Sequence, residues 1–207
     1  MPKNNNTPGC YVRLLIYTTL LLAACSAGGD DESAQLAEPA IQVVGKLENQ
    51  KINEASGLAR SAITEDLLWV INDSGPAAVH AIDHVGGELG RVKIAGAENV
   101  DWEDLASFEY DGNAYLVVAD IGDNHARRKH VTLYVIAEPT TETHRVEIAW
   151  RVDFTYPDGP RDAEALAVDA SGGHFYVLSK RHIPAVLYEL LRHRQGEQPS
   201  QPEQLHI

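Results

Sequence analysis

DWEDLASFEYDGNAYLVVADIGDN occupies residues 101–124. Its middle predicts a β-hairpin, because strand-like residues lie on both sides of DGN at residues 111–113, which tolerate positive φ in a turn. The first expected strand ends at Tyr110, and the second spans residues 115–119. Acidic residues precede the first strand and follow the second. Since these two points lie at one edge of an antiparallel hairpin, the sequence predicts a gathering of carboxylates there.

The same unit occurs three times along the chain. EASGLA at residues 54–59, DWEDLA at 101–106 and DAEALA at 162–167 share an acid first, Ser or Glu third, and Leu-Ala at the end. An apolar run follows each hexad at a nearly constant offset, and a third strand-like run follows that. Repeats of short strands at this spacing are typical of propeller blades. The sequence therefore predicts an all-β fold over residues 41–207, a β-propeller of four-stranded antiparallel blades with about three blades present.

Three blades do not close a propeller, which needs at least four. Three explanations stay open: the chain is a fragment of a longer product, it oligomerises, or it forms an open meander. Open sheet edges invite aggregation, which favours the fragment. The polar final run, QPEQLHI at residues 201–207, agrees with that interpretation.

The N-terminal residues predict export. Lys3 and Arg13 precede a short apolar run that ends in LAAC at residues 22–25, small residues before a cut. This pattern resembles the lipobox of bacterial lipoproteins, which implies that residues 1–24 are a signal peptide and that Cys25 carries lipid. Residues 25–40 are small, polar and acidic, and we expect a flexible tether. The resemblance implies anchoring to the cell envelope, at the outer membrane in a Gram-negative host; the alternative is an ordinary secretory signal.

The acidic composition of the chain limits the classes of partner that it can bind. The chain carries 17 Lys and Arg against 30 Asp and Glu, a net charge of −13, which argues against nucleic acid as a partner. The membrane is expected as a partner through the lipid alone, and the ligand, a small molecule or a protein, stays open. Cys10 would leave with the signal and Cys25 would carry lipid, so thiolate metal sites are excluded.

The motifs resemble a known group of proteins. EASGLA, LWVINDSG, DWEDLA, DIGDN and DAEALAV, which lie between residues 54 and 168, are similar to secreted six-bladed β-propellers of the phytase-like and SMP-30/NHL-like superfamily. The resemblance implies about half of such a propeller. It indicates fold better than activity, because these propellers host hydrolases, dehydrogenases and binding modules alike.

In that group, acids at the ends of inner strands face the channel and often hold Ca²⁺. The resemblance implies six candidate ligands here: Glu54, Asp101, Glu103, Asp120, Asp162 and Glu164. Ca²⁺ takes six to eight oxygens, which converging carboxylates can supply. The alternative is that each acid caps a turn or accepts backbone hydrogen bonds without a metal. Lys180 stands where the first two units have Asp, and with Arg127 and Arg128 it is a candidate for binding an anionic substrate group.

Two function classes follow. The first is a lipid-anchored envelope module that binds a ligand or partner at an acidic, Ca²⁺-binding face. The second, for a full-length parent, is a metal-dependent hydrolase of the phytase-like or lactonase-like kind, with metal-bound water as the nucleophile. The first is favoured because an enzyme of this kind needs a complete channel.

Overall fold

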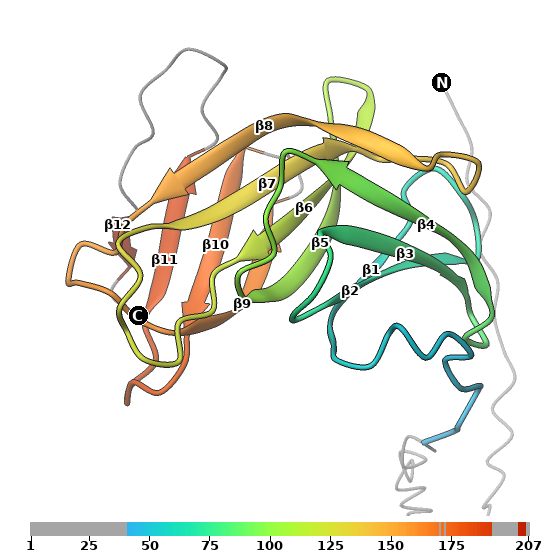
Figure 1. Cartoon of the computed structure of the whole chain (residues 1–207). Coiled ribbons are helices and arrows are strands. Elements are labelled where there is room, and N and C mark those ends of the chain that lie inside the picture. The colour runs from blue at the N-terminus through green and yellow to red at the C-terminus, as the bar shows by residue number, and fades with distance from the viewer. Residues whose placement is uncertain (1–40, 170, 172, 192–202, 206–207) are drawn as a thin grey trace, which may run out of the picture. The chain divides into compact units, whose positions relative to one another are not determined.

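The computed structural model describes residues 41–207 except 170, 172, 192–202 and 206–207, and this part of the chain is all-β (Figure 1). The expected signal peptide (residues 1–24), the lipid-bearing Cys25 and the tether to residue 40 lie outside the described residues. Within the described part, no helix has the length and apolar character that crossing a membrane requires. In chain order the strands are β1 (Ala55–Arg60), β2 (Leu67–Asn72), β3 (Ala78–Asp83), β4 (Glu88–Ala95), β5 (Trp102–Tyr110), β6 (Asn113–Asp120), β7 (Val131–Ala137), β8 (Arg145–Phe154), β9 (Ala163–Val168), β10 (His174–Ser179), β11 (Leu187–Leu191) and β12 (Glu203–Leu205).

Strands β1 to β8 form one eight-stranded mixed sheet, in the order β1-β2-β3-β4-β8-β7-β6-β5. β1–β4 and β5–β8 are each antiparallel meanders, and parallel pairing of β4 with β8, with Ile94 opposite Val146, joins them. The predicted β-propeller of separate four-stranded blades is therefore wrong. Alternation along the sequence defines the two faces of each strand, but it does not define which strand pairs with another at a sheet edge.

The eight-stranded sheet forms a nearly closed barrel, because its two end strands, β1 and β5, come close together. A Cβ added to Gly57 in β1 would lie 2.6 Å from the backbone nitrogen of Leu105 in β5. That distance is too short for any side chain at residue 57, so the approach of the two strands requires glycine.

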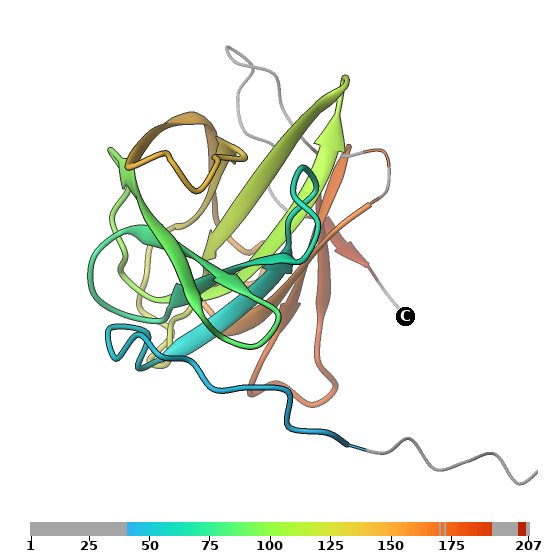
Figure 2. The same ribbon diagram turned by 90° about the vertical axis from the view of Figure 1, so that its right-hand side faces the viewer.

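A small second sheet consists of β9, β10 and β11, with the three-residue β12 at its edge. It lies beside the β5–β6 hairpin in both views of the ribbon (Figures 1 and 2). The backbone N–H of Leu166 in β9 donates to the Asp104 carboxylate of β5 at 2.7 Å. Asp104 thus links the first strand of this sheet to an end strand of the barrel.

Strand β6 lies between two hydrophobic cores. Leu116 and Val118 pack into the core of the barrel with Trp69 and Trp102. Val117 and Ala119 point to the other face and belong to a second core, which includes Phe108, Phe175 and Tyr188. All four β6 residues are fully buried. The unbroken apolar run at residues 115–119 therefore reflects a strand buried on both faces.

The predicted turn of the β5–β6 hairpin is confirmed. Tyr110 pairs with Asn113, which leaves a two-residue loop of Asp111 and Gly112 with φ of 51° and 73°. Two positive φ values define the turn type whose twist matches that of the flanking strands. The turn fixes the register of the hairpin and hence the positions of the acids at its far end.

Candidate metal centre

Each of the three hexads contains a β-bulge. The pairing of β1 with β2 shifts between Ala55 and Gly57, that of β5 with β6 between Trp102 and Asp104, and that of β9 with β10 between Ala163 and Ala165. A bulge leaves one residue unpaired and redirects its side chain. The bulged residues are the third members of the hexads: Ser56, Glu103 and Glu164.

The backbone carbonyl of the first acid in each hexad accepts a hydrogen bond that fixes the position of that residue. The carbonyl of Glu54 accepts a hydrogen bond from the N–H of Asp73 at 2.9 Å, and that of Asp162 accepts one from Lys180 at 2.9 Å. The carbonyl of Asp101 accepts in the same way from Gly122 at 3.1 Å. Each bond ties the start of one strand to the residues after the next strand. The bulges and these bonds place the hexad acids at strand ends, as the sequence predicted.

Three of the six expected metal ligands come together. Carboxylate oxygens of Glu103, Asp162 and Glu164 all lie within 4.8 Å of one another. Asp101 adjoins them, since a Cβ added to Gly122 would lie 2.5 Å from oxygens of both Asp101 and Glu103. Asp101, Glu103, Asp162 and Glu164 are called the acid cluster below. Gly122 therefore lies against two of its members, and any larger residue there would displace their carboxylates.

Burial and neighbouring like charges raise the pKa values of two members of the acid cluster. Burial, with the neighbouring charges of Asp101, Asp73 and Asp162, raises the pKa of Glu103 to about 7, although Lys180 opposes the shift. Burial and the charge and hydrogen bond of Asp73 likewise raise the pKa of Asp101. Such shifts show that the fully ionised cluster is unfavourable without a counter-charge. A proton or a metal cation would relieve the repulsion.

Basic side chains neutralise part of the acid cluster. Lys180 forms an ion pair with Glu164, and the Arg181 Nε donates to Asp162 Oδ2 at 2.7 Å. Asp162 Oδ1 accepts from the backbone N–H of Asp123 at 2.9 Å. Each carboxylate oxygen can accept a second bond, so Asp162 retains capacity for a metal. Lys180, a candidate for binding an anionic substrate group, is thus paired with one of the acids.

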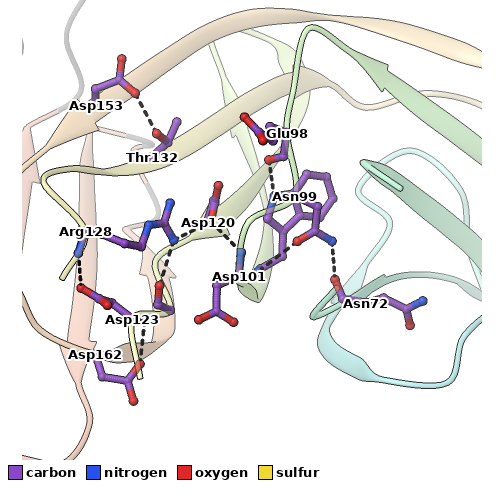
Figure 3. A network of polar contacts seen from close by, with 12 residues as sticks. Asn72, Glu98, Asn99, Asp101, Asp120, Asp123, Arg128, Thr132, Asp153 and Asp162 are labelled. Carbon is purple, nitrogen blue, oxygen red and sulfur yellow. Dashed lines mark hydrogen bonds and ion pairs between the residues drawn. The ribbon is translucent and has the colours of Figure 1, made fainter. Parts of the chain in front are cut away.

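Asp120 and Arg128 form a separate pair. Asp120 is 1% exposed, and its Oδ1 lies 2.7 Å from Arg128 Nη1. The same oxygen accepts from the backbone N–H of Asp101 at 3.1 Å, and Arg128 also donates to the Gly122 carbonyl at 2.9 Å (Figure 3). Asp120 therefore supports the backbone beneath the acid cluster. Arg128, a candidate anion ligand, is engaged by this carboxylate.

The remaining candidates lie apart from the acid cluster. The Glu54 carboxylate accepts a hydrogen bond from the Ser74 hydroxyl and lines a separate polar cavity. Arg127 has an exposed side chain, and its backbone N–H donates to Asp123 at 2.9 Å. The first repeat unit therefore contributes no ligand to the acid cluster. Its first hexad residue, Glu54, lies at the separate cavity, and its third is Ser56, which is not an acid.

Sequence reasoning missed two residues of this region. Arg181 binds Asp162 from a backbone position with φ of 64°, and it also donates to Asn124. Asp104 joins β5 to β9 from a hexad position where any residue was expected. A structural role for the half-buried Asp104 could have been suspected from an acid directly before the Leu-Ala pair of the hexad. Arg181 gave no sequence signal.

Neither the protein-family models nor the curated proteins compared with this sequence give a match. The resemblance to the phytase-like and SMP-30/NHL-like superfamily therefore stays a prediction. Function has to be argued from the geometry of the site.

Proposed function

We propose that this chain is a lipid-anchored binding module of the bacterial cell envelope that holds a divalent cation, Ca²⁺, in the acid cluster. The observation that carries the proposal is the convergence of Glu103, Asp162 and Glu164, whose carboxylate oxygens lie within 4.8 Å of one another. A single ion can contact three oxygens so placed, because Ca²⁺ binds oxygens at about 2.3–2.6 Å.

Ligand chemistry favours Ca²⁺ over the transition metals. All members of the acid cluster offer carboxylate oxygens, and hard cations such as Ca²⁺ and Mg²⁺ prefer oxygen to nitrogen or sulfur. Asp101 adjoins the three converging acids and adds further oxygens. The cluster is formed by two hexads, at the starts of β5 and β9. Ca²⁺ accepts varied coordination by flexible carboxylates, whereas Mg²⁺ demands a strict octahedron and usually keeps several waters.

Anchoring is the second part of the proposal. LAAC at residues 22–25 supports lipidation of Cys25 and retention at the envelope. Metabolic labelling with a radioactive fatty acid tests it: the wild-type chain is expected to take up label, and Cys25→Ser is expected to remain unlabelled. Equal labelling of both chains would contradict the anchor without touching the cation site.

Metal-dependent hydrolysis is a second candidate function. It is favoured by the position of Lys180, whose ammonium lies beside Glu164 and whose charge reaches Glu103. A metal ion with an adjacent ammonium is an arrangement that can bind and polarise a phosphoester. Calcium-dependent release of phosphate from a phosphoester, lost in Lys180→Gln, would favour this candidate over a binding module.

Calcium titration of the purified full chain tests the cation site. A ligand that binds only the folded state stabilises it, by about 2.7 kcal/mol at one hundred times Kd. We expect Ca²⁺ to raise Tm and chelator to reverse the rise. Asp162→Asn and Glu103→Gln should each reduce the rise strongly.

Glu109→Gln is the matched control for Glu103→Gln, because Glu109 is exposed on the same strand, β5, away from the acid cluster. Its response to Ca²⁺ should equal that of the wild type. A folded wild-type chain whose Tm does not respond to millimolar Ca²⁺ would overturn the proposal.

A further inference from the structure

The polar cavity beside Glu54 has a volume of about 520 Å³. The segment before β1, the loop after β2 and the paired strands β3 and β4 form its walls. Its size lies within the range of about 300–1,000 Å³ that is usual for sites that bind small molecules. No member of the acid cluster lines this cavity, so the proposed cation site does not use it.

Opposite charges line the cavity without pairing across it. Lys51 and Arg91 are exposed, and neither forms an ion pair with another of the described residues. Glu54 is exposed as well, and its carboxylate accepts a hydrogen bond from the Ser74 hydroxyl but pairs with no cation in the described part of the chain. Two positive charges and one negative charge are therefore accessible to a ligand.

The two cations lie at the end of the cavity that His80 lines. His80 in β3 pairs with Arg91 in β4, and it is 5% exposed. Burial and the charges of Arg91 and Lys51 lower the pKa of His80, although the charge of Glu88 opposes the shift. The charge of Glu54 is not among those that shift this pKa, which places the acid farther from the imidazole than the two cations. The cavity thus has a cationic end and an acidic end.

A buried amide fixes the wall that joins the two ends. Asn72 is 9% exposed; its Nδ2 donates to the Lys51 carbonyl at 2.6 Å, and its Oδ1 accepts from the Glu54 N–H at 3.3 Å. Gln50 and Asn53 belong to the same wall and are exposed. A side-chain amide donates and accepts hydrogen bonds, as the N–H and C=O groups of a peptide bond require.

We propose that this cavity binds a short peptide, of two or three residues, whose termini are both free. The C-terminal carboxylate binds at Lys51 and Arg91, and the N-terminal ammonium binds at Glu54. The peptide groups between them face Gln50 and Asn53. Because Glu54 repels a simple anion and the two basic side chains repel a simple cation, the cavity favours a ligand that carries both charges.

Triglycine is the probe, and its two blocked forms are the controls. N-acetyltriglycine lacks the ammonium, and triglycinamide lacks the carboxylate. Isothermal titration of the full chain at low salt, where exposed charges are least screened, is expected to give triglycine at least roughly fivefold tighter binding than either blocked form. Equal binding of the three, tighter binding of a blocked form, or no binding of triglycine at millimolar concentration would overturn the proposal.

Two substitutions assign the termini of the bound peptide. Glu54→Gln should bring triglycine to within about twofold of N-acetyltriglycine and leave the preference over triglycinamide unchanged. Arg91→Gln should have the reverse effect, because it weakens the site for the carboxylate. Both residues are exposed, so the fold should tolerate either change. Loss of the same preference in both variants, or of neither preference, would contradict the assignment.

Two further substitutions separate the cavity from the charge of the whole chain, which is −13. Glu65→Gln and Lys93→Gln remove the same charges from exposed residues that do not line the cavity, and Lys93 lies on the same strand as Arg91. Both variants should keep both preferences of the wild type. Effects equal to those of Glu54→Gln and Arg91→Gln would indicate general electrostatic attraction and would overturn the site.

The imidazole of His80 gives a second measurement on the wild-type chain. A carboxylate bound at Lys51 and Arg91 offsets the two charges that lower the pKa of His80, so saturating triglycine should raise this pKa. Proton NMR measures it, with the resonance assigned by its loss in His80→Gln. An unchanged pKa under saturating triglycine would show that the carboxylate binds elsewhere and would overturn the proposal.

Discussion

Two carboxylates at the same edge of the β5–β6 hairpin have opposite surroundings. Asp120, at the end of β6, is almost completely buried, yet Arg128 lies 2.7 Å away and neutralises it. Glu103, the bulged residue of β5, is half-buried, and burial together with the neighbouring charges of Asp101, Asp73 and Asp162 raises its pKa to about 7. Asp120 thus has a cation against its carboxylate, whereas Glu103 lies among other acids. The crowded acids, and not the paired one, are suited to a cation.

Asp120→Ala is expected to have the largest effect on stability, because it removes the buried carboxylate that pairs with Arg128. The substitution leaves Arg128 without its carboxylate and the Asp101 N–H without its acceptor. Breaking a buried ion pair on one side costs about 3–5 kcal/mol. Urea unfolding measures the loss. Glu147→Ala, which breaks the exposed pair with Arg145, should cost less than about 1 kcal/mol; equal losses would show that Arg128 does not stabilise the fold through Asp120.

Gly122→Ala adds a methyl group beside the acid cluster, at a residue whose carbonyl accepts a hydrogen bond from Arg128. Its Cβ would lie 2.5 Å from oxygens of Asp101 and Glu103, so the acid cluster must move. Overpacking of this kind costs about 1–3 kcal/mol, and the Tm rise with Ca²⁺ should shrink as well. Gly173→Ala is the control, since its Cβ would meet only the Ser171 hydroxyl at 3.2 Å. An unchanged calcium response in Gly122→Ala would show that these acids are not the ligands.

The raised pKa of Glu103 predicts that the stability of the protein depends on pH. The folded pKa of Glu103, about 7, lies above its ordinary value of 4.5, so the folded state holds this proton more tightly. The corresponding stability is full below about pH 4.5 and is lost as pH rises towards 7. After allowance for solvent screening we expect a loss of about 1–2 kcal/mol in chelator. Glu103→Gln should remove most of it, since Asp101, whose pKa is also raised, accounts for the rest. Ca²⁺ should reverse it, and a wild-type profile that is flat from pH 4.5 to 7 would contradict the crowded cluster.

Lys180→Gln should have the smallest effect. Lys180 forms a half-exposed pair with Glu164, so stability should change by less than about 1 kcal/mol. Its removal takes away a cation that competes with Ca²⁺, and calcium affinity should rise about two- to threefold. Calorimetric titration measures the change. Weaker calcium binding in this variant would show that the ammonium orders Glu164 for the metal.

The sequence predicted the local structure of this region better than its long-range pairing. The DGN turn and the hexads were sufficient to predict the β5–β6 hairpin and the edge at which its acids lie, since both are local patterns. The parallel pairing of β4 with β8 depends on edges that the strand patterns do not distinguish, and so the propeller was wrongly predicted. Arg181 reaches Asp162 through a turn with positive φ. In the sequence, Asp120 and Glu103 are both acids expected at the same edge of the hairpin. Their different surroundings come from the position of Arg128 beside Asp120 and from the bulge at Glu103.

Strand β6 has a consequence for how the molecule unfolds. The side chains of residues 116–119 fill two different cores alternately, and these four are fully buried. Withdrawing β6 would open the barrel core and the core beneath the second sheet at the same moment. We therefore expect one cooperative unfolding transition, in which tryptophan fluorescence, near-ultraviolet and far-ultraviolet circular dichroism change together.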